Sequence, residues 1–308
     1  MQTVFGLETL SPGWAESTVC IGVFDGVHLG HQSVIRAACD NARANSRPAV
    51  AVTFDRNPLA VLRPERCPKT ILGQNAKLAK IAALGIDLTL VTTFDKSFSQ
   101  MPAQEFLENE LRARICAKKV VVGHDFALGK DRVGTAAWLS ERIPTEILPP
   151  LEQRGRRVSS TEIRKDVAEG QVAEAAALLG GPYELAGIVA KGQQLGKKLG
   201  IPTANIVPII DQVIPKDGIY ACFGTAPQGR FQAAVSLGTR PAIEGAGFAI
   251  EAHLLDFPDR DLYGRFLSLE FVARLRDELW FDSHENLVAQ IRLDIENARE
   301  TLEERSKT

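Results

Sequence analysis

Two histidines three residues apart carry the clearest chemical signal in this sequence of 308 residues. His28 and His31 lie in the segment GVFDGVHLGH (residues 22–31), between an apolar β-branched run and a helical pattern. Backbone N–H groups at the start of such a helix attract phosphate. Two imidazoles at this spacing can face one ligand, and they suit the added charge of a nucleotidyl-transfer transition state. A structural turn with two solvent-facing histidines is the alternative.

A second segment adds hydroxyl groups and a cation. RVSSTEIR (residues 157–164) places Ser160 and Thr161 at the predicted start of a helix and Arg164 one turn later. Hydroxyls at a helix N-terminus beside a cation form an anion site. A helix cap followed by a solvated arginine is the ordinary meaning of these residues on their own.

A glycine-rich loop lies in the second half of the chain. GQQLGKKLGIPTAN (residues 192–205) combines a flexible backbone with Lys197 and Lys198, whose charges suit phosphate. Its glycines are Gly192, Gly196 and Gly200. Pro202 fixes the chain direction, and Thr203 and Asn205 then offer oxygen atoms of the kind that Mg²⁺ prefers. A polar hairpin turn is the alternative for this loop.

The elements that must position the first two segments alternate between strands and helices. The predicted strands are Thr18–Phe24, Ala49–Phe54, Leu88–Thr93 and Lys119–Val122, and the predicted helices are Gln32–Ala44, Asn75–Leu84 and Pro102–Arg112. This alternation favours a Rossmann-like α/β domain, a parallel sheet with helices on its faces. Ligands bind such sheets at the carboxyl ends of the strands, so the residues after Phe24, Phe54 and Val122 are candidates.

The pattern changes after an Ala-rich helical stretch at Ser160–Leu179, which ends in Gly180-Gly181-Pro182. These residues stop a helix, so we place a domain boundary there, with domains at 1–181 and 182–308. The strand-like runs that follow are Tyr183–Val189, Ile219–Gly224, Phe231–Leu237, Ala249–Leu255 and Phe266–Ala273. With no helix between them, they predict an antiparallel barrel or sandwich. A long amphipathic helix from about Ser283 closes the chain.

The composition limits the class of protein. Lys and Arg number 36 and Asp and Glu 38, which gives a formal charge of −2 and no reason to expect nucleic acid or an anionic membrane as partner. Five scattered cysteines without a CxxC pair fit a reducing cytosol. The N-terminus shows no secretory pattern, and no apolar run reaches the roughly 20 residues that cross a bilayer. We therefore expect a cytoplasmic protein, a monomer or weak homo-oligomer.

In the first half, GVFDGVHLGH followed by SSTEIR resembles the paired signature of the HxGH nucleotidyltransferase superfamily, and FDGVHLGH is similar to its flavin-nucleotide branch. TFDRNP and VVGHDFALGKDRVG, both directly after predicted strands, extend the resemblance. It implies that ATP sits over His28 and His31. The residues that would hold its phosphates are Ser160, Thr161 and Arg164. The residues that would border the nucleotide or the flavin are Asn57, Gly123 and Asp125.

In the second half, the loop that ends in PTAN resembles the riboflavin kinase module. DGIYA, SLGTRP, IEAHLLDF and LRDELWF extend this resemblance toward the terminal helix. It implies that Glu251 is the general base, which takes the proton from the riboflavin 5′-hydroxyl as that oxygen attacks the γ-phosphate of ATP. Departures from the two families are Leu128, Thr135, Ser236 and Ala242.

Together the two resemblances cover roughly residues 15–305, in the order found in bacterial bifunctional riboflavin kinase/FAD synthetases. They imply two steps that use ATP and Mg²⁺: riboflavin becomes FMN, and FMN becomes FAD with release of pyrophosphate. The expected catalytic residues are Glu251, His28 and His31, with Thr203 and Asn205 at the metal. The expected nucleotide or flavin contacts are Gly22, Phe24, Asp25, Gly26, Asn57, Gly123, Asp125, Ser160, Thr161, Arg164, Gly192, Gly196, Lys197, Gly200, Pro202 and Arg276.

Three other functions compete with this hypothesis. One is an FMN adenylyltransferase whose barrel only binds flavin, which Ser236 and Ala242 would favour. Another is a tRNA-charging relative, because HxGH-type sites also occur in aminoacyl-tRNA synthetases. The near-neutral charge disfavours it. The third is a flavin-storage protein without turnover, which the presence of His28, His31 and Glu251 disfavours.

Overall fold

The computed structural model describes residues 1–306, except for 11–14, 193–195, 197–199, 240–247 and 259–260. Contacts between residues group the chain into two compact units, Met1–Ser160 and Thr161–Thr308. The predicted boundary lies later, after Gly181. The difference comes from helices α7 (Ser160–Ala168) and α8 (Val172–Leu179), because α8 packs against two strands of the second unit, β11 and β16. Gly170, with φ +79°, separates the two helices where the sequence predicts an interruption.

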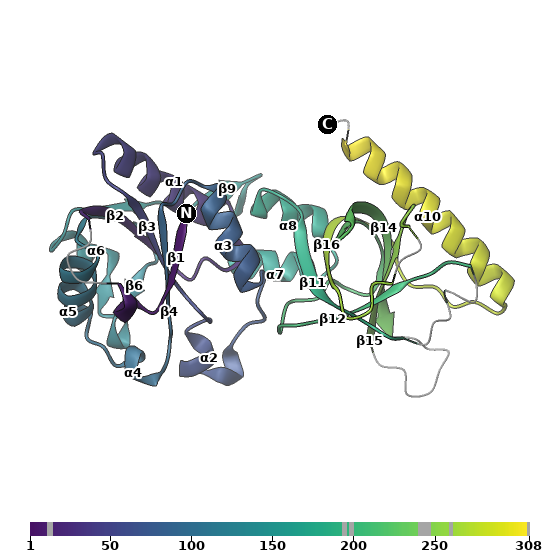
Figure 1. Ribbon diagram of the computed structural model, residues 1–308, viewed down its shortest axis with the longest axis horizontal. Coiled ribbons are helices and arrows are strands. Elements are labelled where there is room, and N and C mark those ends of the chain that lie inside the picture. Colours follow the sequence, from purple (N-terminus) through teal and green to yellow (C-terminus); the bar gives the residue numbers. More distant parts are fainter. Residues whose placement is uncertain (11–14, 193–195, 197–199, 240–247, 259–260, 307–308) are drawn as a thin grey trace. The chain divides into compact units, whose positions relative to one another are not determined.

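The first unit is built on a six-stranded sheet in which every neighbouring pair is parallel (Figure 1). Its strands, in spatial order, are β1 (Gln2–Phe5), β4 (Leu88–Thr92), β3 (Ala49–Phe54), β2 (Ser17–Ile21), β5 (Ala117–Gly123) and β8 (Thr145–Leu148). The chain moves from β2 to β3 and β4 on one side and returns to β5 and β8 on the other. The carboxyl ends of β2 and β5 therefore meet at a topological switch point, where such sheets bind ligands.

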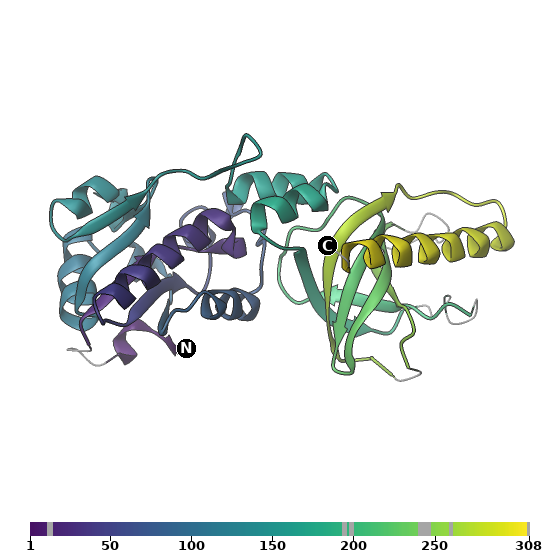
Figure 2. The ribbon, with the colours of Figure 1, turned by 90° about the horizontal axis from the view of Figure 1, so that it is seen from above.

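Helices cover both faces of this sheet (Figures 1 and 2). On one face, α1 (Leu29–Ala44) and α3 (Gln74–Ala83) bury residues such as Ile35 and Ile81. The helix that continues α5, Phe106–Arg114, packs with α6 (Ala136–Ser140) on the other face. This arrangement confirms the predicted α/β domain. The edge strands β1 and β8 were not predicted because both are short and half-exposed, so neither carries a continuous apolar run.

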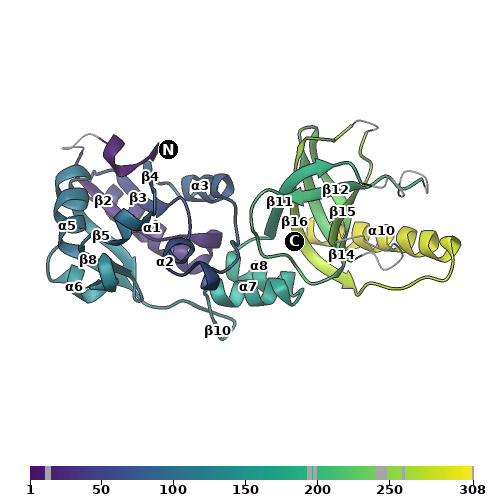
Figure 3. The ribbon, with the colours of Figure 1, turned by 90° about the horizontal axis from the view of Figure 1, so that it is seen from below.

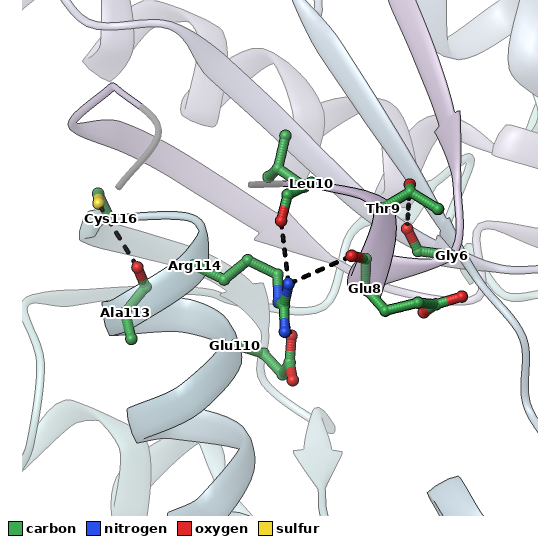
Figure 4. A network of polar contacts seen from close by, with 8 residues as sticks. All are labelled: Gly6, Glu8, Thr9, Leu10, Glu110, Ala113, Arg114 and Cys116. Atoms are coloured by element: carbon green, nitrogen blue, oxygen red, sulfur yellow. Dashed lines mark hydrogen bonds and ion pairs between the residues drawn. The ribbon is translucent and has the colours of Figure 1, made fainter. Parts of the chain in front are cut away.

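The remaining elements of the first unit are short. They are 3₁₀ turns at Leu7–Thr9, Asp25–Val27, Pro64–Arg66 and Lys130–Arg132, helices α2 (Leu59–Leu62), α4 (Lys96–Ser99) and α5 (Ala103–Glu105), and strands β6 (Ala127–Leu128), β7 (Gly134–Thr135), β9 (Glu152–Gln153) and β10 (Arg156–Arg157). Figure 4 shows how Arg114 ties the segment after β1 to the helix Phe106–Arg114: its guanidinium pairs with Glu110 of that helix at 2.8 Å and donates to the Leu10 carbonyl at 2.9 Å.

The second unit is a closed six-stranded barrel (Figure 3). Its strands, in spatial order, are β11 (Tyr183–Ala190), β12 (Ala204–Pro208), β15 (Phe248–Leu254), β14 (Gly229–Thr239), β13 (Gly218–Ala226) and β16 (Phe266–Arg276). All pairs are antiparallel, and β16 closes the ring onto β11. The barrel alternative is therefore correct. Five strands were predicted, whereas β12 was not, because its few residues follow the glycine-rich loop without a distinct apolar pattern.

The interior of the barrel is filled by side chains from alternate strand positions. Tyr183, Tyr220 and Phe271 are fully buried there, and the Phe271 ring contacts the rings of both tyrosines. The Tyr183 hydroxyl donates to the Val213 carbonyl, so this polar atom is satisfied inside an apolar core. Because alternate residues fill the interior, the residues between them face outward and are available for a site.

The terminal helix α10 (His284–Ser306) lies along the outside of the barrel (Figure 2). Ala298 and Leu302 are fully buried against barrel residues that include Val272, and the Ser283 Oγ accepts the Asn286 N–H as the predicted cap. Arg276, at the end of β16, pairs with the buried Asp294 through two of its nitrogens. In the part of the chain that is described, no helix is long and apolar enough to cross a membrane.

Replacing Asp294 with Ala removes one partner of this largely buried pair. We expect the free energy of unfolding, measured with urea, to fall by about 3 kcal/mol because Arg276 keeps a charge that is mostly desolvated. Asp256→Ala is the control, since it breaks a second ion pair between α10 and the barrel, with Arg299, that is exposed to solvent. Exposed ion pairs contribute little to the free energy of unfolding, so this variant should lose much less stability. Similar losses for the two variants would contradict this account.

Candidate active sites

The predicted histidine pair lies directly beyond β2, where the chain turns into α1. His28 is the N-cap residue of α1, and its Nδ1 accepts the backbone N–H of His31 at 3.2 Å. The two imidazole rings stack with their centroids 3.6 Å apart and their planes 16° from parallel. Gly26, with φ +82°, makes the turn that brings them there. The structure thus places both rings together at a helix N-terminus, the arrangement expected of a phosphate site.

Phe24 supports this pair from the protein core. Its side chain is 1% exposed, and its ring meets His31 edge-on with the centroids 5.4 Å apart. A Cβ atom at Gly22 would lie 2.7 Å from the Phe24 ring, so only glycine leaves room for it. A ligand contact by Phe24 would therefore come from its backbone, since its side chain is packed in the core.

Asp25 anchors the histidine loop to the next part of the sheet. Its carboxylate is 8% exposed and accepts the backbone N–H groups of Ile71, at 3.0 Å, and Leu72, at 3.3 Å. These groups lie just before α3. Charged acceptors of backbone N–H groups make strong hydrogen bonds, so this carboxylate fixes the loop, whatever it contributes to a ligand.

Lys77 is a buried residue beside the histidine loop that our sequence reasoning missed. It lies on α3 and is 6% exposed, and its ammonium group donates to the Phe54 carbonyl at 2.8 Å, the Thr53 hydroxyl at 3.3 Å and the Val23 carbonyl at 3.4 Å. Burial lowers its pKa to about 8, against the opposing effect of nearby Asp25. A signal was present in the sequence, because Lys77 occupies the same helix face as the apolar Ile81, four residues later.

The second predicted segment reaches the histidine loop through Ser160. The Ser160 Oγ donates to the Asp25 carbonyl at 3.2 Å, across 135 positions of sequence. A Cβ atom at Gly30, near the start of α1, would lie 3.9 Å from the Val158 carbonyl. The backbone just before Ser160 therefore lies against the start of α1. Thr161 and Arg164 follow on α7 and belong to the second compact unit.

The other candidates of the first unit lie beyond the strands that flank β2. Asn57 follows β3, and its Oδ1 accepts the Leu59 N–H at 3.0 Å. Gly123 ends β5, and Asp125 lies two residues later, exposed, with a carboxylate oxygen 3.6 Å from the Arg157 guanidinium. Because parallel strands end at one edge of the sheet, these residues border the same edge as the histidines.

In the second unit, strand register gathers the predicted kinase residues. Glu251 on β15 is paired with Asn205 on β12 and with Ser236 on β14, so the three lie side by side across the barrel wall. Their strand neighbours, such as Ile250 and Ala252, are buried inside the barrel. Alternation along the strands therefore turns the three polar side chains to the outer face of the barrel wall.

The ends of the glycine-rich loop lie against these residues. A Cβ atom at Gly192 would be 3.4 Å from the Asn205 side chain, and one at Gly196 would be 2.4 Å from the Ile201 carbonyl and 3.1 Å from the Thr203 hydroxyl. Glycine is therefore required at position 196 for the chain to approach this closely.

Pro202 and Gly200 complete this side of the barrel. The Pro202 carbonyl accepts the Nδ1–H of His253 at 2.8 Å, and His253 lies two residues beyond Glu251 on the same strand. Gly200 has a φ of +77°, in the region that favours glycine. Lys197 and Lys198 lie outside the described residues, as does Ala242.

Two further charged residues lie near the end of β16. Arg276, a predicted ligand contact, uses its guanidinium in the ion pair with Asp294. Glu278, which we did not predict, lies so close to β14 that a Cβ atom at Gly238 would be 2.1 Å from its carboxylate. Burial raises the pKa of Glu278, and the charge of Asp217 adds to this rise. Glu278 thus extends the polar surface formed by Ser236 and Glu251.

The buried ammonium group of Lys77 makes the stability of the protein depend on pH. Its pKa is about 8 in the folded state and 10.5 in an unfolded chain, so the unfolded state binds more protons between these values. The free energy of unfolding of the wild type, relative to Lys77→Met, should rise by about 2 kcal/mol from pH 7 to pH 10. Denaturant titrations at both pH values measure this rise. Lys80→Met, on a more exposed position of α3, should follow the wild type.

Comparison with known proteins assigns each unit to a family. Residues 11–162 match the family described as FAD synthetase, and residues 179–302 match the family described as riboflavin kinase. The first range contains the histidine pair, Asn57, Asp125 and Ser160. The second contains the glycine-rich loop and Glu251. The interval between the two ranges, residues 163–178, holds most of α7 and α8, and the predicted boundary after Gly181 lies just inside the second range.

Relatives and a solved structure match nearly the whole chain. The bifunctional riboflavin kinase/FMN adenylyltransferase of Escherichia coli is 33% identical over 97% of both chains, and that of Listeria monocytogenes is 34% identical over 91% of both. A crystal structure described as a macrolide-efflux protein from Streptococcus pneumoniae superposes with a TM-score of 0.86, at 31% identity over 97% of this chain and 99% of the other. The two family matches and these relatives show that the chain belongs to the bifunctional riboflavin kinase/FMN adenylyltransferase family.

Proposed function

We propose that the chain makes FAD from riboflavin in two reactions at two separate sites. The barrel transfers the γ-phosphoryl group of ATP to riboflavin and releases ADP and FMN. The α/β unit then transfers AMP from a second ATP to FMN and releases pyrophosphate and FAD. The observation that carries this proposal is the presence of two distinct polar constellations in two compact units: the stacked His28 and His31 in one, and Asn205 paired with Glu251 in the other.

Phosphorylation of riboflavin requires removal of one proton. The 5′-hydroxyl oxygen attacks the γ-phosphorus, the bond from that phosphorus to the β–γ bridging oxygen breaks, and the hydroxyl proton passes to a base. Glu251 suits this role because its carboxylate is half-buried on the barrel wall, between Asn205 and Ser236. A base must lie within hydrogen-bond reach of the proton that it takes, and the paired strands hold Glu251 in a fixed position.

Thr203 and Asn205 fit a magnesium ion at this site. Their side chains lie against Gly196 and Gly192, so a hydroxyl and a side-chain amide line the backbone that would cradle phosphates. Mg²⁺ prefers such oxygen ligands together with substrate phosphates and water. When bound, it supplies charge that offsets the negative charge of the transferring phosphoryl group. These residues would hold the ion beside Glu251, which lies in register with Asn205.

Adenylyl transfer needs little base catalysis, since the phosphate of FMN is already ionised. One of its oxygens attacks the α-phosphorus of ATP, and the bond to pyrophosphate breaks. The His28 Nδ1 accepts a backbone N–H, so in the neutral ring the proton resides on Nε2. His28 can therefore donate Nε2–H to a phosphate oxygen, and the adjacent His31 ring doubles the number of imidazoles available to offset charge at the α-phosphorus.

The cellular context remains the one that the sequence predicts. The five cysteines are all free thiols, and Cys20, Cys39 and Cys222 are buried. Free thiols are the normal state in a reducing cytoplasm, which supports a cytoplasmic location. The expected partners are riboflavin, FMN and ATP, with no nucleic acid or membrane. A monomer or weak homo-oligomer remains our prediction.

One assay tests both reactions. The purified chain is incubated with ATP and Mg²⁺ and either riboflavin or FMN, and the flavins are separated by chromatography. We expect FMN and then FAD from riboflavin, and FAD alone from FMN. If no FMN forms from riboflavin, the kinase proposal is wrong. If no FAD forms from supplied FMN, the adenylyltransferase proposal is wrong.

Removing the base should affect only the first reaction. We expect Glu251→Gln to lower the rate of FMN formation by about 100-fold or more, the scale of general-base catalysis, and to leave the conversion of FMN to FAD unchanged. Glu270→Gln is the matched control. Glu270 is also a strand carboxylate of the barrel, but it pairs with Arg230 at 2.6 Å. An equal loss in both variants would remove Glu251 from the catalytic role.

Changing the histidines should have the opposite effect. His28→Asn keeps a side-chain acceptor for the helix N-terminus but removes the imidazole. We expect it to lower FAD formation from FMN by about 100-fold, with FMN formation from riboflavin unchanged. Alanine at both His28 and His31 should lower it further. His284→Asn, at an exposed position at the start of α10, serves as the control. Loss of both activities in folded His28→Asn would contradict two separate sites.

A further inference from the structure

We propose that Lys77 is a positioning residue for adenylyl transfer, which fixes the loop that carries His28 through the carbonyl group of Val23. This inference rests on the proposed adenylyltransferase activity of the α/β unit. Lys77 lies on α3, and its ammonium group contacts backbone carbonyls at the carboxyl ends of two neighbouring strands, β2 and β3. It acts through other residues and is not proposed to touch either substrate.

The contacts of the ammonium group join both strands. Its Nζ donates to the Phe54 carbonyl at the end of β3, to the Thr53 hydroxyl, and to the Val23 carbonyl just beyond β2. The Thr53 hydroxyl in turn donates to the same Val23 carbonyl at 3.1 Å. Val23 thus receives two hydrogen bonds from one buried group of side chains, and the backbone leaving β2 is held at that point.

Val23 immediately precedes the strained part of the loop. Phe24 has a left-handed backbone conformation, with φ 52° and ψ 31°, and Val27 also has a positive φ, at 43°. Such conformations cost energy in residues other than glycine and persist only where the surroundings impose them. Asp25 supplies a second restraint through the N–H groups of Ile71 and Leu72. Both restraints come from one stretch of chain, residues 71–77.

The charge of Lys77 matters because three acceptors surround it. A lysine ammonium group has three N–H donors, one for each of the Val23, Thr53 and Phe54 oxygens, whereas a neutral amine has only two. The carboxylates of Asp25 and Asp55 favour the charged form, while burial disfavours it and lowers the pKa to about 8. Loss of the proton above that pH should therefore release one of the three contacts.

The first test compares Lys77→Met with Lys80→Met on the same helix. We expect Lys77→Met to lower kcat for FAD formation from FMN by about 10- to 100-fold, the scale of a small misplacement of catalytic groups. Riboflavin phosphorylation by the same chain should not change, which shows that the barrel unit is unaffected, and a melting profile like that of the wild type shows that the α/β unit is folded. Lys80→Met should keep both activities. Equal kcat for FAD formation in the two variants would overturn the proposal.

The second test measures how kcat depends on pH. A lysine with a merely structural role would not change this dependence. At saturating substrates, kcat of the wild type for FAD formation should fall as pH rises from 7.5 to 9.5. The lower kcat of Lys77→Met should lack this fall, and Lys77→Arg, which stays charged, should lack it too. A wild-type fall that persists in Lys77→Met belongs to another group and would overturn the proposal.

A third variant serves if Lys77→Met does not fold. Thr53→Val removes only the hydroxyl that links Lys77 to Val23 and keeps the shape of the side chain. We expect a loss of about 3- to 10-fold in kcat for FAD formation, because one of two restraints on Val23 disappears. An unchanged kcat would refute the proposal. If the wild type itself makes no FAD from FMN, the proposed function is wrong. If the wild type makes FAD and the variants make it equally fast, only the role of Lys77 is wrong.

Discussion

The first site depends on two buried charged side chains, Asp25 and Lys77, which fix the loop between β2 and α1. The Asp25 carboxylate accepts N–H groups before α3, and the Lys77 ammonium group donates to oxygens at the ends of β2 and β3. The loop between β2 and α1 contains non-glycine residues with positive φ, including Phe24. A backbone of this kind keeps its shape only when several strong hydrogen bonds impose it. The stacking of His28 on His31 depends on that shape.

The site on the barrel holds its polar groups by another means. It is fixed by strand register, because residues paired across neighbouring strands face the same side. Asn205, Glu251 and Ser236 are paired in this way across β12, β15 and β14. A one-residue slip in any of these strands would turn its side chain into the apolar interior, so the packed core itself enforces the register. The two sites thus use different physical means to hold their polar groups.

Much of the fold followed from pattern alone. The strand at Ala49–Phe54 was predicted with its observed bounds, and the cap at Ser283 was predicted from a hydroxyl before an amphipathic helix. Elements without a strong local pattern were missed. β12 has five residues and follows a loop, yet the barrel closes only through its pairing with β11 and β15. Its existence is decided by partners far away in the sequence.

The sequence by itself determined which chemistry is present: the histidines at a helix start, the glycine-rich loop before Thr203 and Asn205, and a two-part organisation. Residue type and spacing carry that information because turns, caps and phosphate cradles are local. Only the tertiary structure decided how these groups are held. It placed the Ser160 hydroxyl on the Asp25 carbonyl across 135 positions, buried Phe24 beneath His31, and brought Lys77 to Val23. Such contacts depend on chain packing, which brings together residues that no local pattern connects.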